Sequence, residues 1–243
     1  TVCPATTTAP RRSGSSSPLT LAHQRWHTGG VTDVTLELEV AWQLHVGGER
    51  RSLDSLLARH REKHRRYHTA THVAWVIRHV DELAATEQVE HLHEVVAAAF
   101  YHDAVYEPAY PANEAASARL ARRDLTAFGW DSAAVERVGS MIEATAHDAT
   151  NSEPTDGDTA ILLDADLAIL GADPAAYSSY VAAVRSEYRH LDDDDWRDGR
   201  TSVLDGFLAR PEIYSTSFGR DHWEARARAN LTAELAELAE LRN

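Results

Sequence analysis

The sequence predicts an all-α fold: a single helical bundle of about eight to ten helices, preceded by a flexible N-terminal extension. Three observations indicate this fold class. After residue 33, apolar residues recur at spacings of three and four, which is the pattern of one helix face. Asp, Asn and Pro stand where helices would begin. Alternating strand patterns are scarce, and residues 31–40 form the one fair candidate, which fits a helix equally well.

The N-terminal extension comprises residues 1–33, which are rich in Thr, Ser, Pro and Ala and have no apolar periodicity, so we expect them to be flexible. Arg11 and Arg12 form a twin arginine, but no apolar stretch of useful length follows them. We therefore reject an export signal and expect a cytoplasmic protein. Residues 34–243 contain no internal repeat and no linker, which predicts one domain.

Within this domain, apolar stripes mark a helix around residue 73 and another at the C-terminus. The stripes consist of Val73, Val76, Ile77, Val80, Leu83 and Ala84, and of Leu231, Leu235, Leu238 and Leu241. Helix starts are predicted at Pro111 to Glu114, at Asp131, and at Asp173 with Pro174. The aspartates at 192–195 are interpreted as a solvated loop and helix N-terminus rather than a metal site.

The composition narrows the possible functions. The 243 residues include 24 Lys and Arg against 38 Asp and Glu, a formal charge of −14, which disfavours binding to a nucleic acid polymer. A single cysteine, Cys3, excludes a cysteine-rich zinc site. The longest apolar run, residues 95–101, is far too short to span a bilayer, so we expect no membrane partner. The 14 histidines are many, and histidine is a common metal ligand and proton carrier.

Four short segments place histidines or carboxylates in helical surroundings. They contain His68 and His72, His102 and Asp103, His147 and Asp148, and Asp164 and Asp166. Each alone has an ordinary explanation, such as a helix end. A charged group against an apolar stretch nevertheless needs a partner, because burying it alone costs several kcal/mol. Together, nitrogen and oxygen ligands from several helices suit a catalytic divalent metal rather than a structural zinc.

The order His72, His102-Asp103, Asp166 resembles the signature of the HD superfamily of metal-dependent phosphohydrolases. Flanking residues extend the resemblance to one predicted bacterial subfamily over about residues 40–241. They are Arg65-x-Tyr67-His68-x-x-x-His72, Phe100-Tyr101-His102-Asp103-Ala104-Val105-Tyr106, Asn113-Glu114, Asp164-Ala165-Asp166-Leu167-Ala168-Ile169-Leu170-Gly171, Arg185-x-Glu187-Tyr188, Gly199-Arg200, Ile213-Tyr214 and Ala227-Arg228-x-Asn230-Leu231.

The resemblance implies an HD-domain-like helical fold around one divalent metal, with Mn, Co, Ni, Fe, Zn and Mg all open. By position, the metal ligands would be His72, His102, Asp103 and Asp166. Asp164 lies about 200° around the helix from Asp166, so it would be a cap or a supporting group. His68 and His147 are candidates for contact with the substrate or a second metal.

The expected activity is release of phosphate from a small phosphomonoester, a nucleotide being the leading candidate, by attack of a metal-activated water. Asp103 and His68 are candidate catalytic residues. Some HD nucleotidases that this chain resembles carry a Glu three residues after the Asp of the signature. Tyr106 stands there in this chain, which leaves Glu107 and Glu114 as candidate bases. Candidate substrate-binding residues are Arg65, His147, Arg185, Tyr188, Arg200 and Arg228.

Two other functions stay open. A di-iron oxygenase would use His68, His147 and Asp148 as further ligands, and oxygen uptake would identify it. A non-catalytic nucleotide-binding module would bind its ligand without turnover. A homodimer is compatible with the family resemblance, but no sequence feature identifies an interface.

Overall fold

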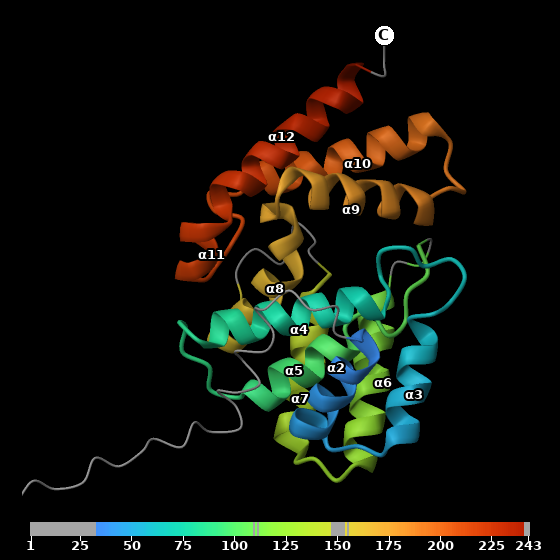
Figure 1. Cartoon of the computed structure of the whole chain (residues 1–243), viewed down its shortest axis with the longest axis vertical. Coiled ribbons are helices and arrows are strands. Elements are labelled where there is room, and N and C mark those ends of the chain that lie inside the picture. The colour runs from blue at the N-terminus through green and yellow to red at the C-terminus, as the bar shows by residue number, and fades with distance from the viewer. Residues whose placement is uncertain (1–32, 109, 111, 147–153, 155, 241–243) are drawn as a thin grey trace, which may run out of the picture. The chain divides into compact units, whose positions relative to one another are not determined.

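All secondary-structure elements of the described residues are helical, which confirms the all-α prediction (Figure 1). The computed structural model describes residues 33–108, 110, 112–146, 154 and 156–240, so the predicted extension up to residue 32, His147 and Asp148 lie outside the described residues. From Val34 onward the chain forms one compact unit.

The described residues form eleven α-helices, a π-helical turn η1 and a 3-10 turn η2. They are α2 (Val34–Ala41), η1 (Trp42–Val46), α3 (Arg50–Arg59), α4 (Ala70–Ala84), α5 (Leu92–Tyr101), α6 (Asn113–Ala127), α7 (Ser132–Ala144), α8 (Gly157–Leu167), η2 (Ala168–Gly171), α9 (Pro174–Glu187), α10 (Asp193–Leu208), α11 (Ser217–His222) and α12 (Glu224–Glu240). The count exceeds the predicted range slightly because elements as short as α11 carry no clear apolar stripe.

The predicted helix starts are confirmed. Asp131, Asp173 and Asp192 each cap a helix by accepting hydrogen bonds from backbone amides two and three residues later. Helix α6 begins at Asn113, as expected. The segment that fitted either a strand or a helix forms α2 from Val34 onward. The 192–195 aspartates belong to a helix N-terminus, where their negative charge is favourable.

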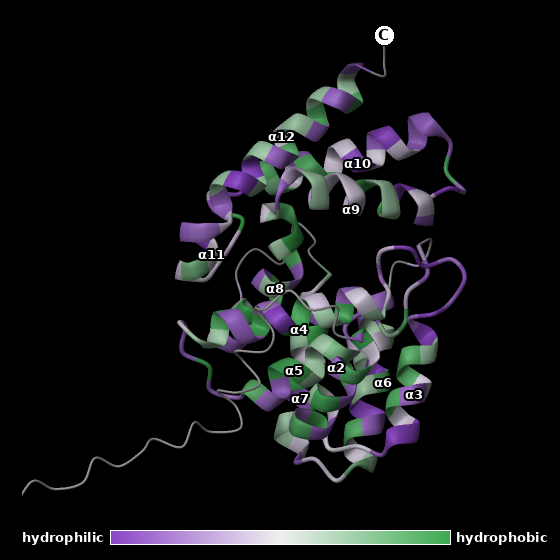
Figure 2. Cartoon of the chain, viewed as in Figure 1, coloured by the Kyte–Doolittle hydropathy of each residue, from purple (hydrophilic) through white to green (hydrophobic). Residues whose placement is uncertain are grey.

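Helices α2 to α7 form a lower group in the view of Figure 1, and α5 lies at its centre. It packs against α4, α6, α7 and α8, and its residues from Glu94 to Tyr101 are all buried. The ring of Phe100 meets that of Trp42 edge to face at 5.2 Å between centroids. Figure 2 shows hydrophobic residues concentrated on α5. Because α5 is buried, its last turn cannot move without disturbing the packing of the core. The residues that directly follow α5 are therefore held in a fixed position.

Above α8 in Figure 1 lies a second group of helices, which consists of α9, α10 and α12. Helix α8 packs against α4 and α5, and η2, which continues it, packs against α9 and α12. Residues at the end of α8 therefore face both groups of helices. No helix within the described residues is both long and apolar enough to cross a membrane.

Candidate metal centre and adjoining cavity

Four side chains from three helical segments converge at the end of α8. His72 lies in the first turn of α4, His102 and Asp103 directly follow α5, and Asp166 is in the last turn of α8. Nε2 of His72 lies 3.0 Å from Nε2 of His102. The same His72 atom lies 3.3 Å from Oδ2 of Asp103 and 3.2 Å from Oδ1 of Asp166. Nε2 of His102 lies 3.1 Å from the Asp103 oxygen and 3.6 Å from the Asp166 oxygen.

These separations fit the donor set to a divalent ion. Ligand atoms about 2.1 Å from a metal are about 3.0 Å apart at right angles and about 3.4 Å apart at tetrahedral angles. Suitable donor atoms of His72, His102 and Asp103 all lie within 4.8 Å of one another. Asp166 joins this group through its contacts with both imidazoles. Two neutral imidazoles and two carboxylates suit Zn, Mn, Fe, Co or Ni and leave the metal's identity open.

The surroundings prepare His102 to bind a metal through Nε2. Its Nδ1 lies 2.9 Å from the carbonyl oxygen of Ala99, so Nδ1–H donates and Nε2 is the nitrogen left to bind either a proton or a metal. Burial lowers the pKa of His102, but the carboxylates of Asp103 and Asp166 outweigh burial and raise that pKa well above its ordinary value. The cluster thus attracts positive charge, for which protons and a divalent ion compete. Nδ1 of His72 is buried and meets no hydrogen-bond partner in the described part of the chain.

His68 lies next to the cluster and is oriented by Glu187 of α9. Nδ1 of His68 lies 2.7 Å from Oε2 of Glu187, and since a carboxylate only accepts, Nδ1 must carry the proton. Oε1 accepts from the backbone amides of Arg66, Tyr67 and His68, and Oε2 also accepts from the hydroxyl of Tyr106. Burial raises the pKa of Glu187, but these hydrogen bonds, led by that of His68, outweigh burial and lower the pKa to about 2.

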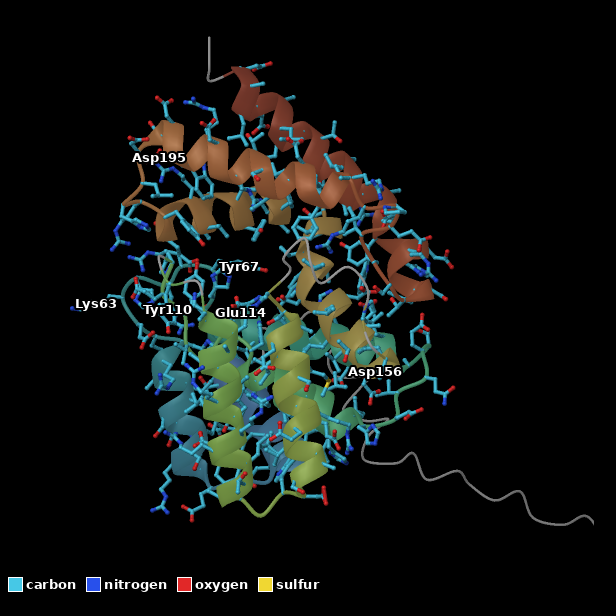
Figure 3. All side chains as sticks on the ribbon, turned by 180° about the vertical axis from the view of Figure 1, so that it is seen from behind. Lys63, Tyr67, Tyr110, Glu114, Asp156 and Asp195 are labelled. Atoms are coloured by element: carbon cyan, nitrogen blue, oxygen red, sulfur yellow. The ribbon has the colours of Figure 1, made fainter. Side chains whose placement is uncertain are left out.

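A cavity of about 440 Å³ adjoins the cluster. The residues that line it are Tyr67, His68, His102, Asp103, Tyr106, Glu114, Thr145, Ala146, Asp166, Leu167, Ile169, Leu170, Tyr180, Val184, Tyr188, Leu191, Trp196, Gly199, Arg200, Val203 and Phe207. Figure 3 shows Tyr67 and Glu114 between the lower group of helices and the α9–α10 pair. The hydroxyl of Tyr67 is buried and meets no hydrogen-bond partner among the described residues, so it is able to donate to a bound ligand.

Of the predicted substrate-binding residues, Tyr188 and Arg200 line the cavity, whereas Arg65, Arg185 and Arg228 are not among its lining residues. Arg65 is buried and donates to the backbone carbonyls of His68, Asp103 and Ala104. It therefore holds the two segments that carry the candidate ligands together.

The other two predicted substrate-binding arginines that do not line the cavity also stabilise the backbone. Arg185 donates to the carbonyls of Tyr188 and Leu191 and to the carboxylate of Asp193. Arg228 pairs with Glu224 and donates to the carbonyls that end α10 and follow it. These arginines act on the fold rather than directly on a ligand.

The candidate carboxylates are also placed differently from one another. Glu107 is exposed and is not among the cavity-lining residues, so the geometry does not favour it as the base, whereas Glu114 lines the cavity. Asp164 is buried away from the cluster, where it accepts from the amides of Ser215 and Thr216 at 2.9 and 2.7 Å. Asp164 thus anchors the segment that leads into α11, apart from the four-residue cluster.

Sequence reasoning did not single out Glu187, Tyr67, Tyr180 or Trp196 as site residues. Glu187 and Tyr67 stood within the motifs of the family resemblance, which was the available signal for them. Tyr180 and Trp196 lie in segments without any chemical motif, and they reach the cavity through the packing of α9 and α10.

No protein-family model, curated protein or solved structure matches this chain. The resemblance to the HD superfamily therefore stays an expectation, and the case for function depends on the residues of the cluster and cavity.

Proposed function

We propose that this protein is a metal-dependent phosphohydrolase that releases phosphate from a small phosphomonoester, with a nucleotide as one candidate substrate. The observation that carries the proposal is the convergence of His72, His102, Asp103 and Asp166 beside the cavity, with donor atoms 3.0–3.6 Å apart. When bound there, a divalent ion supplies a hydroxide near neutral pH and a Lewis acid for a phosphoryl oxygen.

The chain's own residues provide the remaining groups that such a reaction needs. Because Glu187 holds the proton of His68 on Nδ1, Nε2 of His68 is left as the basic nitrogen of a ring that lines the cavity. A histidine at that position is able to accept a proton from an attacking water and return it to the leaving oxygen. The hydroxyl of Tyr67 supplies a neutral donor to a phosphoryl oxygen.

Burial of the imidazole ligands and partial exposure of the carboxylates support access from the cavity. The side chains of His72 and His102 are 2% and 1% exposed, whereas those of Asp103 and Asp166 are 18% and 15% exposed. The carboxylates are therefore the more accessible groups of the cluster. A substrate phosphate entering the cavity reaches the cluster from the carboxylate side.

The proposal is tested by loading the whole protein with Mn²⁺, Co²⁺, Ni²⁺, Fe²⁺, Zn²⁺ or Mg²⁺ and measuring phosphate release from a panel of phosphomonoesters. Asp166→Asn should abolish both metal binding and phosphate release. Asp164→Asn is the matched control on the same helix and should retain both. The proposal fails if the ion binds and no member of the panel is hydrolysed. Oxygen uptake with two irons per chain would instead support the oxygenase, and tight nucleotide binding without product would support the binding module.

A further inference from the structure

The cavity wall away from the metal cluster is formed largely by apolar side chains of α9 and α10. Trp196, Gly199, Val203 and Phe207 fall on one face of α10 because their spacings are three and four residues, and all four line the cavity. Tyr180 and Val184 of α9 line it as well. Trp196 packs against Tyr188 and Phe207 is buried in the core, whereas Gly199 and Val203 between them are exposed.

The middle of this wall is open. Val203 is 49% exposed although it is apolar. A Cβ placed on Gly199 would meet no atom of the described residues within 4 Å, so a side chain there would extend into space that they leave open. Glycine is a poor residue for a helix interior, and no close neighbour requires it at this position. Apolar surface left next to a polar reaction site is suited to the apolar part of a ligand.

Charge further limits the ligand. Arg200 is the one Lys or Arg among the described residues that line the cavity, and it is already engaged. Its Nε and Nη2 donate to the two carboxylate oxygens of Glu234 at 2.8 and 3.0 Å, and Nη1 donates to the hydroxyl of Tyr180 at 3.2 Å. Glu114 adds a carboxylate to the lining. A second phosphate on the ligand would therefore find no uncommitted Lys or Arg among the described residues of the lining.

We infer that the α9–α10 wall is a subsite for an uncharged apolar or aromatic group. The substrate is then a phosphomonoester of an alcohol that carries an apolar or aromatic group, and nucleotide substrates are restricted to monophosphates. Diphosphates, triphosphates and polyhydroxylated sugar phosphates are disfavoured. The inference rests on the proposed function for the identity of the phosphate end, while the apolar subsite itself is a matter of binding.

The test uses straight-chain alkylphosphonates from methyl to octyl, which have no phosphate ester bond to hydrolyse. Calorimetric titration of the Mn²⁺-loaded protein should give an affinity that rises about two- to fourfold with each methylene until the cavity is full. Val203→Asp should abolish this dependence on chain length. Val40→Asp is the matched control, because Val40 is equally exposed at 49% but lies on α2, outside the cavity lining. It should retain the full dependence.

A second variant tests the subsite by size. Gly199→Leu should end the rise in affinity at a shorter chain, because its side chain occupies the space that the longer alkyl groups use. An affinity independent of chain length in the wild-type protein would overturn the inference, and so would an unchanged dependence in both Val203→Asp and Gly199→Leu.

Failure of the subsite and failure of the proposed function give different results. If affinity rises with chain length but no alkyl phosphate is hydrolysed, the subsite is supported and the phosphohydrolase proposal is not. If alkyl phosphates are hydrolysed at rates independent of chain length and the phosphonate affinities are equally flat, the phosphohydrolase is supported and the subsite is overturned.

Discussion

The Glu187→Gln variant should preserve the fold and reverse the proton arrangement on His68. The carboxylate of Glu187 accepts three hydrogen bonds from backbone amides and two from side chains, those of His68 and Tyr106. Glutamine retains one oxygen for the amides, but its NH₂ group replaces the oxygen that faces His68. Nδ1 of His68 must then accept, so the proton moves to Nε2, and the basic nitrogen at the cavity is lost.

The expected cost to stability follows from these contacts. Hydrogen bonds to a charged group contribute about 1.5–3 kcal/mol each, against about 0.5–1.5 kcal/mol for neutral ones. Five weakened bonds would cost several kcal/mol, but the neutral amide also avoids the desolvation of a buried charge. We therefore expect a loss of about 2–4 kcal/mol in the free energy of unfolding.

This loss should depend on pH. Because the folded pKa of about 2 lies below the ordinary 4.5, the contribution of Glu187 is complete above pH 4.5 and is lost as pH falls toward 2.

The assay combines urea unfolding, steady-state kinetics and ¹⁵N NMR of the His68 ring. We expect kcat to fall about 10²- to 10⁴-fold with little change in KM, and the NMR spectrum to report a proton on Nε2 instead of Nδ1. Glu224→Gln is the matched control, because Glu224 also accepts from two amides and an arginine but is not among the cavity-lining residues. It should lower stability without lowering kcat. Full activity of Glu187→Gln, or an equal loss in Glu224→Gln, would refute this account of His68.

Three further predictions concern groups outside the proposed chemistry. His60 is buried, and burial followed by the charge of Arg65 lowers its pKa to about 3, so stability should fall as pH drops from 6.5 toward 3. In urea unfolding between pH 6 and 4, His60→Leu should reduce the decrease in unfolding free energy by up to about 1.4 kcal/mol per pH unit. An unchanged slope would contradict the lowered pKa of His60. Arg65→Lys should lower the unfolding free energy by about 2–4 kcal/mol, because lysine cannot donate to the carbonyls of Asp103 and Ala104 at the same time, as the guanidinium group does. A loss below about 1 kcal/mol in the same assay would argue against this structural role of Arg65. Glu107→Gln should change kcat less than about twofold, because Glu107 is exposed outside the cavity lining, and a hundredfold loss would restore it as a candidate base.

The sequence predicted those features that depend on local chemistry. The apolar stripe around Val73 defines α4 because a helix needs one buried face, and the aspartates at 131 and 173 cap helices by bonding to amides close by in the chain. The histidines and carboxylates of the cluster were recognisable because such groups stand out in apolar helices.

The partners of long side chains were not predictable in the same way. Glu187 reaches His68 across 119 positions in the chain, and no local pattern encodes that contact. Arg65, Arg185 and Arg228 were candidate phosphate ligands because they are arginines within the motifs of the family resemblance, yet their guanidinium groups bond to backbone carbonyls. An arginine has five donors on a flexible stem, so only the folded surroundings decide which acceptors it meets.

We propose that His72, His102, Asp103 and Asp166 hold one divalent ion between them. The most direct test equilibrates the whole protein with Mn²⁺, removes free metal by dialysis and measures bound metal by elemental analysis, with circular dichroism to confirm that each variant is folded. We predict about one ion per chain in the wild type and in Asp164→Asn, and close to none in folded His102→Ala and Asp166→Asn. A folded wild type that retains no ion, or equal retention by the ligand variants, would contradict the claim.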